Sequence, residues 1–216
     1  MFFIKLFLAF IIYAFIGWIL EIIYTYIRTK KVINRGFLIG PYCPIYGMGC
    51  ILITLLLKKY YDDPIVLAIM SMIICSLLEY ITSYAMEKVF KARWWDYRDR
   101  KFNINGRICL ETLVPFGIGS LVIMYVVNPF IVNLLNIIPE IIIYILFISI
   151  FVMFVLDIII SFNAISKIRI SSKKILEDST EEITKHVKKY LLNNFKQWKR
   201  ISKSFPDLKI LRNRKK

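Results

Sequence analysis

The chain has 216 residues, of which 58% are hydrophobic, and its 30 Lys and Arg against 15 Asp and Glu give a net charge of +15. A soluble domain has about 45–50% apolar residues, so this composition excludes an ordinary soluble domain and indicates an integral membrane protein. The four cysteines follow no zinc or redox spacing and the one histidine, His186, lies in a polar stretch, so we expect neither a metal site nor a cofactor.

Five apolar runs approach the length of about 20 residues that a helix needs to cross a bilayer. We therefore predict an all-α integral membrane fold with five transmembrane helices. The predicted spans are residues 3–27, 37–57, 64–87, 108–132 and 138–162. They form a transmembrane domain over residues 1–162, and residues 163–216 follow it as a cytoplasmic tail.

The charges of the connections predict the orientation of the spans. The first and third connections are rich in Lys and Arg, the second sums to zero, and the fourth carries no charge. Because basic loops mark the cytoplasmic side, we expect the N-terminus outside and the C-terminus inside. The sequence thus predicts a multi-pass protein of the cell (plasma) membrane.

The tail over residues 163–216 carries most of the positive charge, with 16 Lys and Arg against 5 Asp and Glu. Apolar residues recur in it at helical spacing: Ile183, Val187, Leu191, Phe195 or Trp198, Ile201 and Phe205. A basic amphipathic helix next to a span suits the anionic inner leaflet, which is the partner that we predict for it. A docking helix for a partner protein is the alternative, and without a recognition motif we expect no nucleic acid.

The first part of the chain contains what we interpret as two copies of one motif. The first copy begins at Glu21 and ends in the Gly- and Pro-rich residues 36–49, and the second begins at Glu79 and ends in residues 115–119. In the predicted orientation both copies run in the same sense, so they form a parallel two-helix repeat with one further helix. Paired Gly/Pro-broken spans point to a binding site in a membrane protein.

Four acids lie within or at the edges of the apolar runs: Glu21, Glu79, Glu111 and Asp157. A charge at the centre of a span costs about 2.5–3.5 kcal/mol, so such residues rarely face lipid. All four fall in the predicted cytoplasmic half, and we infer an inward-facing vestibule there. Its predicted lining and substrate- or ion-binding residues are Glu21, Arg35, Tyr46, Glu79, Asn105, Arg107 and Glu111.

Two interpretations of this vestibule stay open. Arg35 and Arg107 hold matching places in the two copies, and they would neutralise the acids if the charges serve only to pair one another. The other interpretation is a site for an ion, a proton or a substrate. Tyr46 likewise has an alternative role as a packing aromatic at the membrane interface.

The third connection combines aromatic and polar residues: Trp94, Trp95, Asp96, Tyr97 and Asn103. Adjacent tryptophans beside charges are typical of an aromatic belt at the level of the lipid headgroups. The functional alternative is a structured cytoplasmic cap, in which Asn103, Asn105 and Arg107 make hydrogen bonds over the vestibule.

Several of these strings carry a family resemblance. They are Gly17-Trp18 with Glu21, GPYCPIYG at residues 40–47, WWDY at residues 94–97 and FNINGRICL at residues 102–110. Over about residues 10–160 the chain resembles the putative ABC-transporter type IV permease family of bacterial membrane proteins. The resemblance implies a permease subunit of a bacterial inner membrane that moves a substrate with the help of a separate ATPase.

The leading functional hypothesis is therefore a membrane permease or transport component. The chain has no GxxxxGK[ST] motif and no recognisable catalytic constellation, so a transport component is favoured over an enzyme. Five spans are few for half a transporter, so a second copy or a separate ATPase subunit would be needed. The alternatives are a membrane-embedded enzyme acting on a lipid-type substrate, and a scaffold or sensor whose tail binds a partner.

Overall fold

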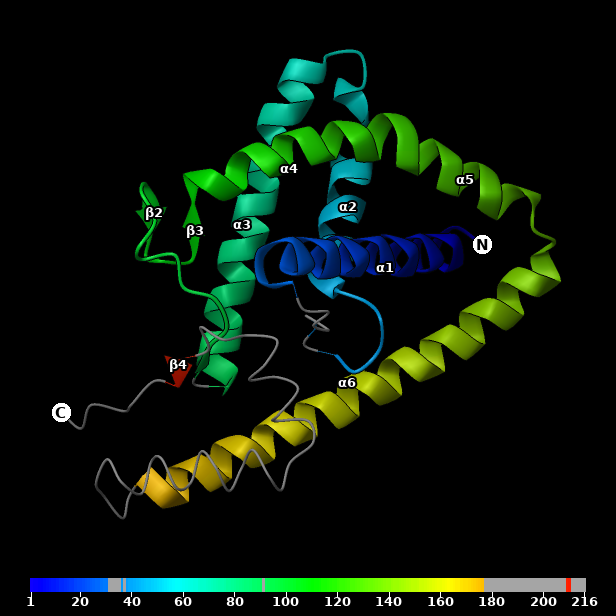
Figure 1. Ribbon diagram of the computed structural model, residues 1–216. Coiled ribbons are helices and arrows are strands. Elements are labelled where there is room, and N and C mark those ends of the chain that lie inside the picture. Colours follow the sequence, from blue (N-terminus) through cyan, green and yellow to red (C-terminus); the bar gives the residue numbers. More distant parts are fainter. Residues whose placement is uncertain (31–35, 37, 91, 177–208, 211–216) are drawn as a thin grey trace.

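The structure is a computed structural model that describes residues 1–30, 36, 38–90, 92–176 and 209–210 (Figure 1). Its helices are α1 (Phe2–Thr29), α2 (Pro44–Leu56), α3 (Pro64–Phe90), α4 (Leu110–Val122), α5 (Asn128–Ile137) and α6 (Glu140–Leu176), with a short 3-10 helix η1 (Lys58–Tyr60) and a π-helical segment η2 (Ile123–Val127). Its strands are β1 (Ala92–Arg93), β2 (Asn103–Ile104), β3 (Ile108–Cys109) and β4 (Lys209–Ile210). The described part is thus mostly helical, as predicted.

Four helical segments of the described residues are long and apolar enough to cross a membrane. They are Phe2–Ile27, Pro64–Phe90, Leu110–Ile137 and Glu140–Asn163. They confirm a multi-pass membrane protein and match the first, third, fourth and fifth predicted spans. The second predicted span contains only the 13 residues of α2 as helix. At 1.5 Å per residue α2 is about 20 Å long, which is less than the thickness of a bilayer.

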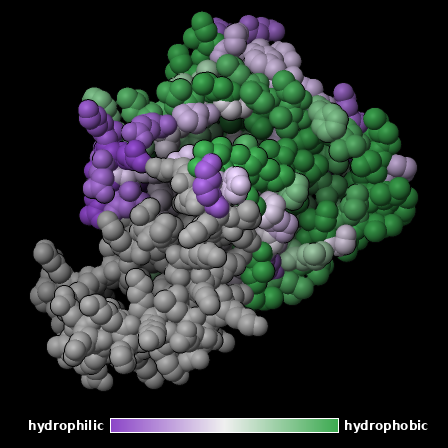
Figure 2. Space-filling model, in the orientation of Figure 1, coloured by the Kyte–Doolittle hydropathy of each residue, from purple (hydrophilic) through white to green (hydrophobic). Residues whose placement is uncertain are grey.

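One face of the long helix over residues 110–137 is apolar and exposed. Its exposed residues follow one another every four positions: Leu110, Val114, Ile118, Val122, Val126 and Phe130. Apolar side chains that no other helix covers face the acyl chains when the helix spans a bilayer. We call this set the α4 stripe, and Figure 2 shows hydrophobic residues spread over the region of α4 and α5.

Glycines bring α1 and α2 close together. A Cβ atom on Gly17 would overlap the side chain of Tyr46, and one on Gly47 would lie 2.7 Å from the carbonyl oxygen of Phe10. Small residues let two membrane helices approach to backbone contact, where packing rather than hydrophobicity holds them together. The two glycines therefore fix α2 against α1.

The helix over residues 110–137 packs against two different partners. Near its start Gly117 lies against Met72 of α3, and further along Met124 packs in a buried cluster with Leu67. Its second half turns to α1, where the hydroxyl group of Tyr13 donates a hydrogen bond of 2.8 Å to Asn128. The most extensive helix contacts thus join α1 with α2 and α3 with α4, and each pair holds one copy of the predicted motif.

The breaks that Gly and Pro were expected to make differ between the two copies. Residues 38–43 are not helical and α2 begins with Pro44 at its first turn, so the first break is present. The predicted break at residues 115–119 is wrong, because α4 continues through Pro115. A proline in a membrane helix removes one backbone hydrogen bond, but the helix can continue because neighbouring groups satisfy the backbone group that is left unpaired.

The predicted tail begins inside a helix, because α6 continues past residue 162 to Leu176. The predicted amphipathic helix lies outside the described residues. Near the end of the chain, β4 pairs antiparallel with β1, with Ile210 opposite Ala92 and Lys209 opposite Arg93. The C-terminal strand is thus connected to the loop that follows α3.

Candidate functional site

A non-helical segment over residues 38–43 precedes α2, and Asp157 of α6 holds it. One carboxylate oxygen accepts hydrogen bonds from the amide of Ile39 (2.9 Å) and the hydroxyl group of Ser161 (2.8 Å). The other accepts from the amide of Gly40 (2.7 Å) and the phenol of Tyr42 (2.6 Å). Asp157 is 7% exposed. This carboxylate therefore has a structural role that the sequence did not reveal.

The carboxylate of each motif copy receives a hydrogen bond from a tyrosine hydroxyl group. In the first copy, Tyr46 of α2 donates to Glu21 of α1 over 2.6 Å. In the second copy, Tyr97 of the third connection donates to Glu79 of α3 over 3.1 Å. Thr112 of α4 lies 3.5 Å from the other oxygen of Glu79, which is buried with 8% exposure.

Tyr97 lies within electrostatic range of both acids. Burial raises the pKa of the Tyr97 phenol above its ordinary range, and the negative charges of Glu79 and, more weakly, of Glu21 raise it further. The phenol therefore keeps its proton at physiological pH and remains a donor to Glu79. The structure thus brings Glu21, Tyr46, Glu79 and Tyr97 into one neighbourhood, which we call the two-acid site.

Arg107 lies against the cytoplasmic-side end of α3 in the predicted orientation. Its guanidinium group donates to Glu87 over 2.7 Å, and its carbon Cζ lies 5.6 Å from the ring centre of Tyr80 and 5.4 Å from that of Tyr84. Arg107 is 7% exposed, and its Nε has no hydrogen-bond partner. Burial disfavours its charge, but the hydrogen bond and the charge of Glu87 keep its pKa above the usual value.

The partner of Arg107 differs from the ones that the sequence suggested. In one of the two open interpretations Arg107 would neutralise Glu21, Glu79 or Glu111, whereas the structure pairs it with Glu87. The spacing of the three residues that contact Arg107 could have indicated this site. Tyr84 and Glu87 follow Tyr80 by four and seven residues, which places all three on one face of a helix.

The third connection is a structured cap on α3. The amide group of Asn105 donates to the hydroxyl of Tyr80 over 2.9 Å, and the indole of Trp95 donates to the carbonyl oxygen of Arg107 over 3.1 Å. Asn103 donates to the carbonyl of Arg100 over 2.8 Å and accepts from the amide of Gly106 over 3.0 Å. These bonds lie within the connection and join it to α3.

Of the remaining acids of the predicted set, Glu111 lies at the surface, whereas the side chain of Asp96 is only 4% exposed. Glu111 pairs with Arg100 over 3.1 Å, and their side chains are 59% and 44% exposed. Asp96 pairs with Arg98 over 2.6 Å. The other predicted residue, Arg35, lies outside the described residues. Of the predicted vestibule residues, the structure thus brings together Glu21, Tyr46 and Glu79, adds Tyr97 and Thr112, and places Glu111 apart.

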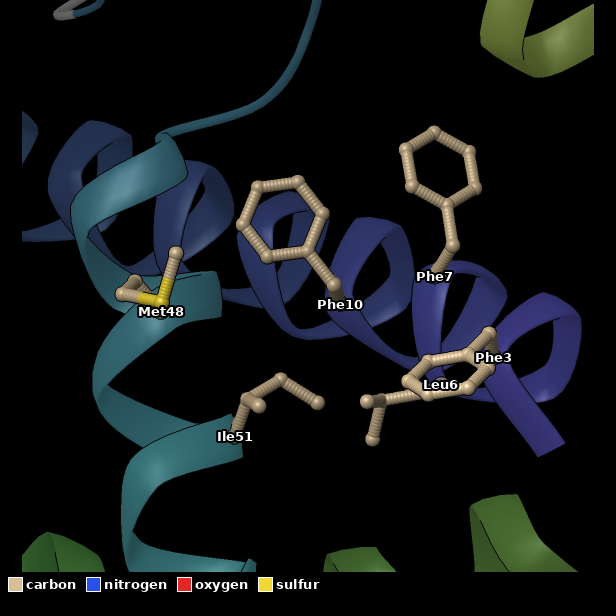
Figure 3. Close-up of a pocket in the computed structure, with 6 residues that line it drawn as sticks. All are labelled: Phe3, Leu6, Phe7, Phe10, Met48 and Ile51. Carbon is tan, nitrogen blue, oxygen red and sulfur yellow. The ribbon is translucent and has the colours of Figure 1, made fainter.

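An open depression of about 200 Å³ lies between α1 and α2 (Figure 3). It is lined by Phe3, Leu6, Phe7, Phe10, Met48 and Ile51. Figure 3 shows Leu6 and Ile51 pointing toward one another across it. Its lining has no polar side chain that could orient a charged ligand, so the two-acid site and this depression are separate features.

Replacing Arg107 with lysine tests the cap. Lysine keeps the charge but loses the planar group that stacks on two tyrosine rings, and we expect a loss of about 1–3 kcal/mol in the free energy of unfolding. Unfolding of the purified protein in mixed detergent micelles measures this. The matched control is Arg100→Lys, whose exposed pair with Glu111 should matter little. Equal effects of the two changes would show that the stacked arrangement contributes no stability.

A family model described as Putative ABC-transporter type IV matches residues 8–162. No curated protein and no solved structure matches the chain. The matched region includes the whole two-acid site and the cap, and it ends inside α6.

Proposed function

Because the chain belongs to the Putative ABC-transporter type IV family, we propose that it is the membrane-embedded permease subunit of a transporter driven by a separate ATPase. The sequence supports the division of labour, since it contains no GxxxxGK[ST] motif with which to bind and hydrolyse ATP. The family and the apolar helices indicate a membrane transport component. We further propose that ATP hydrolysis by a separate subunit drives transport and that the two-acid site binds the substrate or ion.

The observation that carries the proposal is the environment of Glu79. Its carboxylate is buried within a span and accepts a hydrogen bond from the hydroxyl group of Tyr97, while the hydroxyl group of Thr112 lies 3.5 Å from its other oxygen. A buried carboxylate in a membrane protein marks a pathway for ions, protons or substrate. We place the substrate- or ion-binding site at Glu79 and Glu21, one from each copy of the motif.

In this proposal the cap controls access to the site. Tyr97 belongs to the third connection, and its phenol covers Glu79 on the side of that loop. In the predicted orientation this is the cytoplasmic side, where a partner ATPase would act. Movement of the loop would remove the phenol from Glu79 and expose the carboxylate to the cytoplasm, as lid motions do in other membrane and soluble proteins.

Replacing Glu79 with glutamine tests the proposal in the native complex. The protein is purified in mild detergent from cells that express it, and we expect a P-loop ATPase to co-purify in a fixed ratio. In liposomes, Glu79→Gln should lower the ATP-driven transport of the complex by about tenfold or more, because the amide keeps the size of the side chain but loses its charge, and a hydrogen bond to a charged group contributes about 1.5–3 kcal/mol. Glu21→Gln should act in the same direction.

The matched control is Glu111→Gln, the same change at an exposed carboxylate on the neighbouring helix. We expect it to transport like the wild type. Equal transport by all the variants would remove the two acids from the mechanism, and the absence of any ATPase from the purified complex would contradict the proposed division of labour.

A further inference from the structure

The strands β2 and β3 form a tight hairpin immediately before α4. Ile104 pairs with Ile108 and Asn103 with Cys109, and the amide of Arg107 donates to the carbonyl of Ile104 over 3.0 Å. The two central residues of this turn have positive φ angles, 53° at Asn105 and 66° at Gly106. Asn-Gly is the sequence that such a turn prefers, because both residues tolerate the left-handed conformation.

One face of the hairpin is apolar and uncovered. Directly opposed residues of an antiparallel pair point to the same face, so Ile104 and Ile108 share one face and Asn103 and Cys109 share the other. Cys109 is 2% exposed, which makes its face the inner one. On the outer face Ile104 is 57% exposed. Figure 2 shows this outer region among hydrophilic residues.

Phe102 adds to this uncovered surface. It directly precedes β2, has a φ of 51° and is 79% exposed. A bulky residue at positive φ is uncommon and must be held by its surroundings. The hydrogen bonds of Asn103 to the carbonyls of Arg98 and Arg100 hold this corner of the loop. Phe102 is therefore held outward, away from the protein.

The outer face of the hairpin continues into the α4 stripe. β3 ends at Cys109 and α4 begins at Leu110, which is the first residue of the stripe and is 49% exposed. Side chains alternate along a strand, so Ile108 and Leu110 lie on the same side of the chain as it enters the helix. Since the α4 stripe faces lipid, the hairpin directly before it lies at the interface between the acyl chains and the headgroups.

Exposed basic side chains lie beside this apolar face, together with the exposed acids Asp99 and Glu111. Lys101 is exposed, and the side chains of Arg98 and Arg100 are 56% and 44% exposed. Both arginines pair with a carboxylate, but a guanidinium group has five N–H donors and keeps several of them for a second anion. Basic side chains beside apolar ones are the arrangement that binds an anionic membrane surface.

We propose that the β2–β3 hairpin is a membrane anchor, in which Phe102 and Ile104 insert among the acyl chains of the adjacent leaflet while Arg98, Arg100 and Lys101 bind the phosphate groups of anionic phospholipids. A partner protein could also cover an apolar hairpin. We favour lipid over a partner protein because the hairpin is continuous with the α4 stripe. The stripe begins at Leu110, directly after β3, and its side chains face the acyl chains.

The anchor is connected to the two-acid site. The amide of Tyr97 donates to the carbonyl of Gly106 in the turn of the hairpin over 2.8 Å, and the phenol of Tyr97 donates to Glu79. A hairpin held in the leaflet therefore also holds the donor that covers the buried carboxylate. The anchor itself does not depend on the proposed transport function, since it follows from the surface of the hairpin alone.

The insertion is tested with the full chain carrying Phe102→Cys and a fluorescent NBD label, reconstituted in lipid nanodiscs. We expect blue-shifted emission and loss of fluorescence when the lipids carry brominated acyl chains, with little quenching by iodide in the water. The labelled wild type corrects for the native cysteines. The control site is Asp62→Cys in the exposed connection before α3, which should be quenched by iodide.

Quenching of the label at residue 102 by iodide and not by brominated lipid would overturn the proposal. Protection from both quenchers would also overturn it, because that is the result that a protein covering the hairpin would give. Thermal unfolding of the labelled protein ensures that a misfolded variant is not used.

The headgroup contacts are tested separately. Native mass spectrometry of protein from nanodiscs that contain phosphatidylcholine and phosphatidylglycerol counts the lipids that stay bound. We expect the variant Arg98→Gln, Arg100→Gln, Lys101→Gln to lose phosphatidylglycerol, while Lys58→Gln, Lys59→Gln in η1 retains it. Equal retention by the two variants would show that these three cations do not bind the anionic headgroup.

Discussion

Replacing Asp157 with alanine is expected to lower the free energy of unfolding by at least about 3 kcal/mol. The change removes the acceptor for four hydrogen bonds, two of them from the half-buried amides of Ile39 and Gly40, and a hydrogen bond to a charged group contributes about 1.5–3 kcal/mol. Denaturation in mixed detergent micelles measures the loss. Limited proteolysis should also cut the variant within residues 38–43 before it cuts the wild type.

Two further variants separate packing from hydrogen bonding. Leu156→Ala is the control, since this neighbouring side chain is 53% exposed. Asp157→Asn should be nearly as unstable as the alanine variant, because its amide group would turn a donor toward the donors that the carboxylate accepts. If Asp157→Ala were as stable as Leu156→Ala, the non-helical segment would not depend on this carboxylate.

Replacing Gly17 with alanine should lower the free energy of unfolding by about 1–3 kcal/mol, the usual range for an overfilled contact. The added methyl group overlaps the side chain of Tyr46 where it joins the backbone, so rotation of the ring cannot relieve the clash. α2 would have to move away from α1. The hydrogen bond between Tyr46 and Glu21 should lengthen or break as a result.

The matched control is Gly119→Ala, because a Cβ atom there meets nothing within 4 Å. Its effect should be neutral or stabilising by up to about 1 kcal/mol, because alanine favours a helix interior over glycine. Unfolding in the same micelles compares the two. If both glycine variants unfolded alike, close contact between α1 and α2 at Gly17 would not contribute to stability.

Hydropathy alone predicted four of the spans to within a few residues at their starts, because an apolar helix in lipid needs only length and composition. It overestimated the second span, where a run of apolar residues does not form one helix. Residues 38–43 are extended or bent, and the amides of Ile39 and Gly40 donate to Asp157, a residue more than a hundred positions away. No local pattern contains that contact.

In the candidate site, too, the sequence predicted some residues but not the contacts that they make. Glu21 and Glu79 stood out because a carboxylate within an apolar run is expensive, and the structure places both near Tyr97. Their hydroxyl donors were not predictable in detail, since Thr112 reaches Glu79 only through the packing of α4 on α3. The hairpin was not predicted either, although Asn105-Gly106 is a dipeptide that favours a tight turn between strands.

The π-helical segment η2 sets the rotational phase between the two halves of the long helix. In an α-helix with 3.6 residues per turn, a row at every fourth residue drifts around the axis by about 40° per step. A π segment closes its hydrogen bonds over five residues and turns less per residue, so it takes back part of this drift. The π-helical segment Ile123–Val127 thus helps to keep both Leu110 and Phe130, the first and last residues of the α4 stripe, exposed. The π-helical segment therefore changes the rotation of the helix about its axis. One side of the helix packs against α3, another side packs against α1, and the α4 stripe faces lipid.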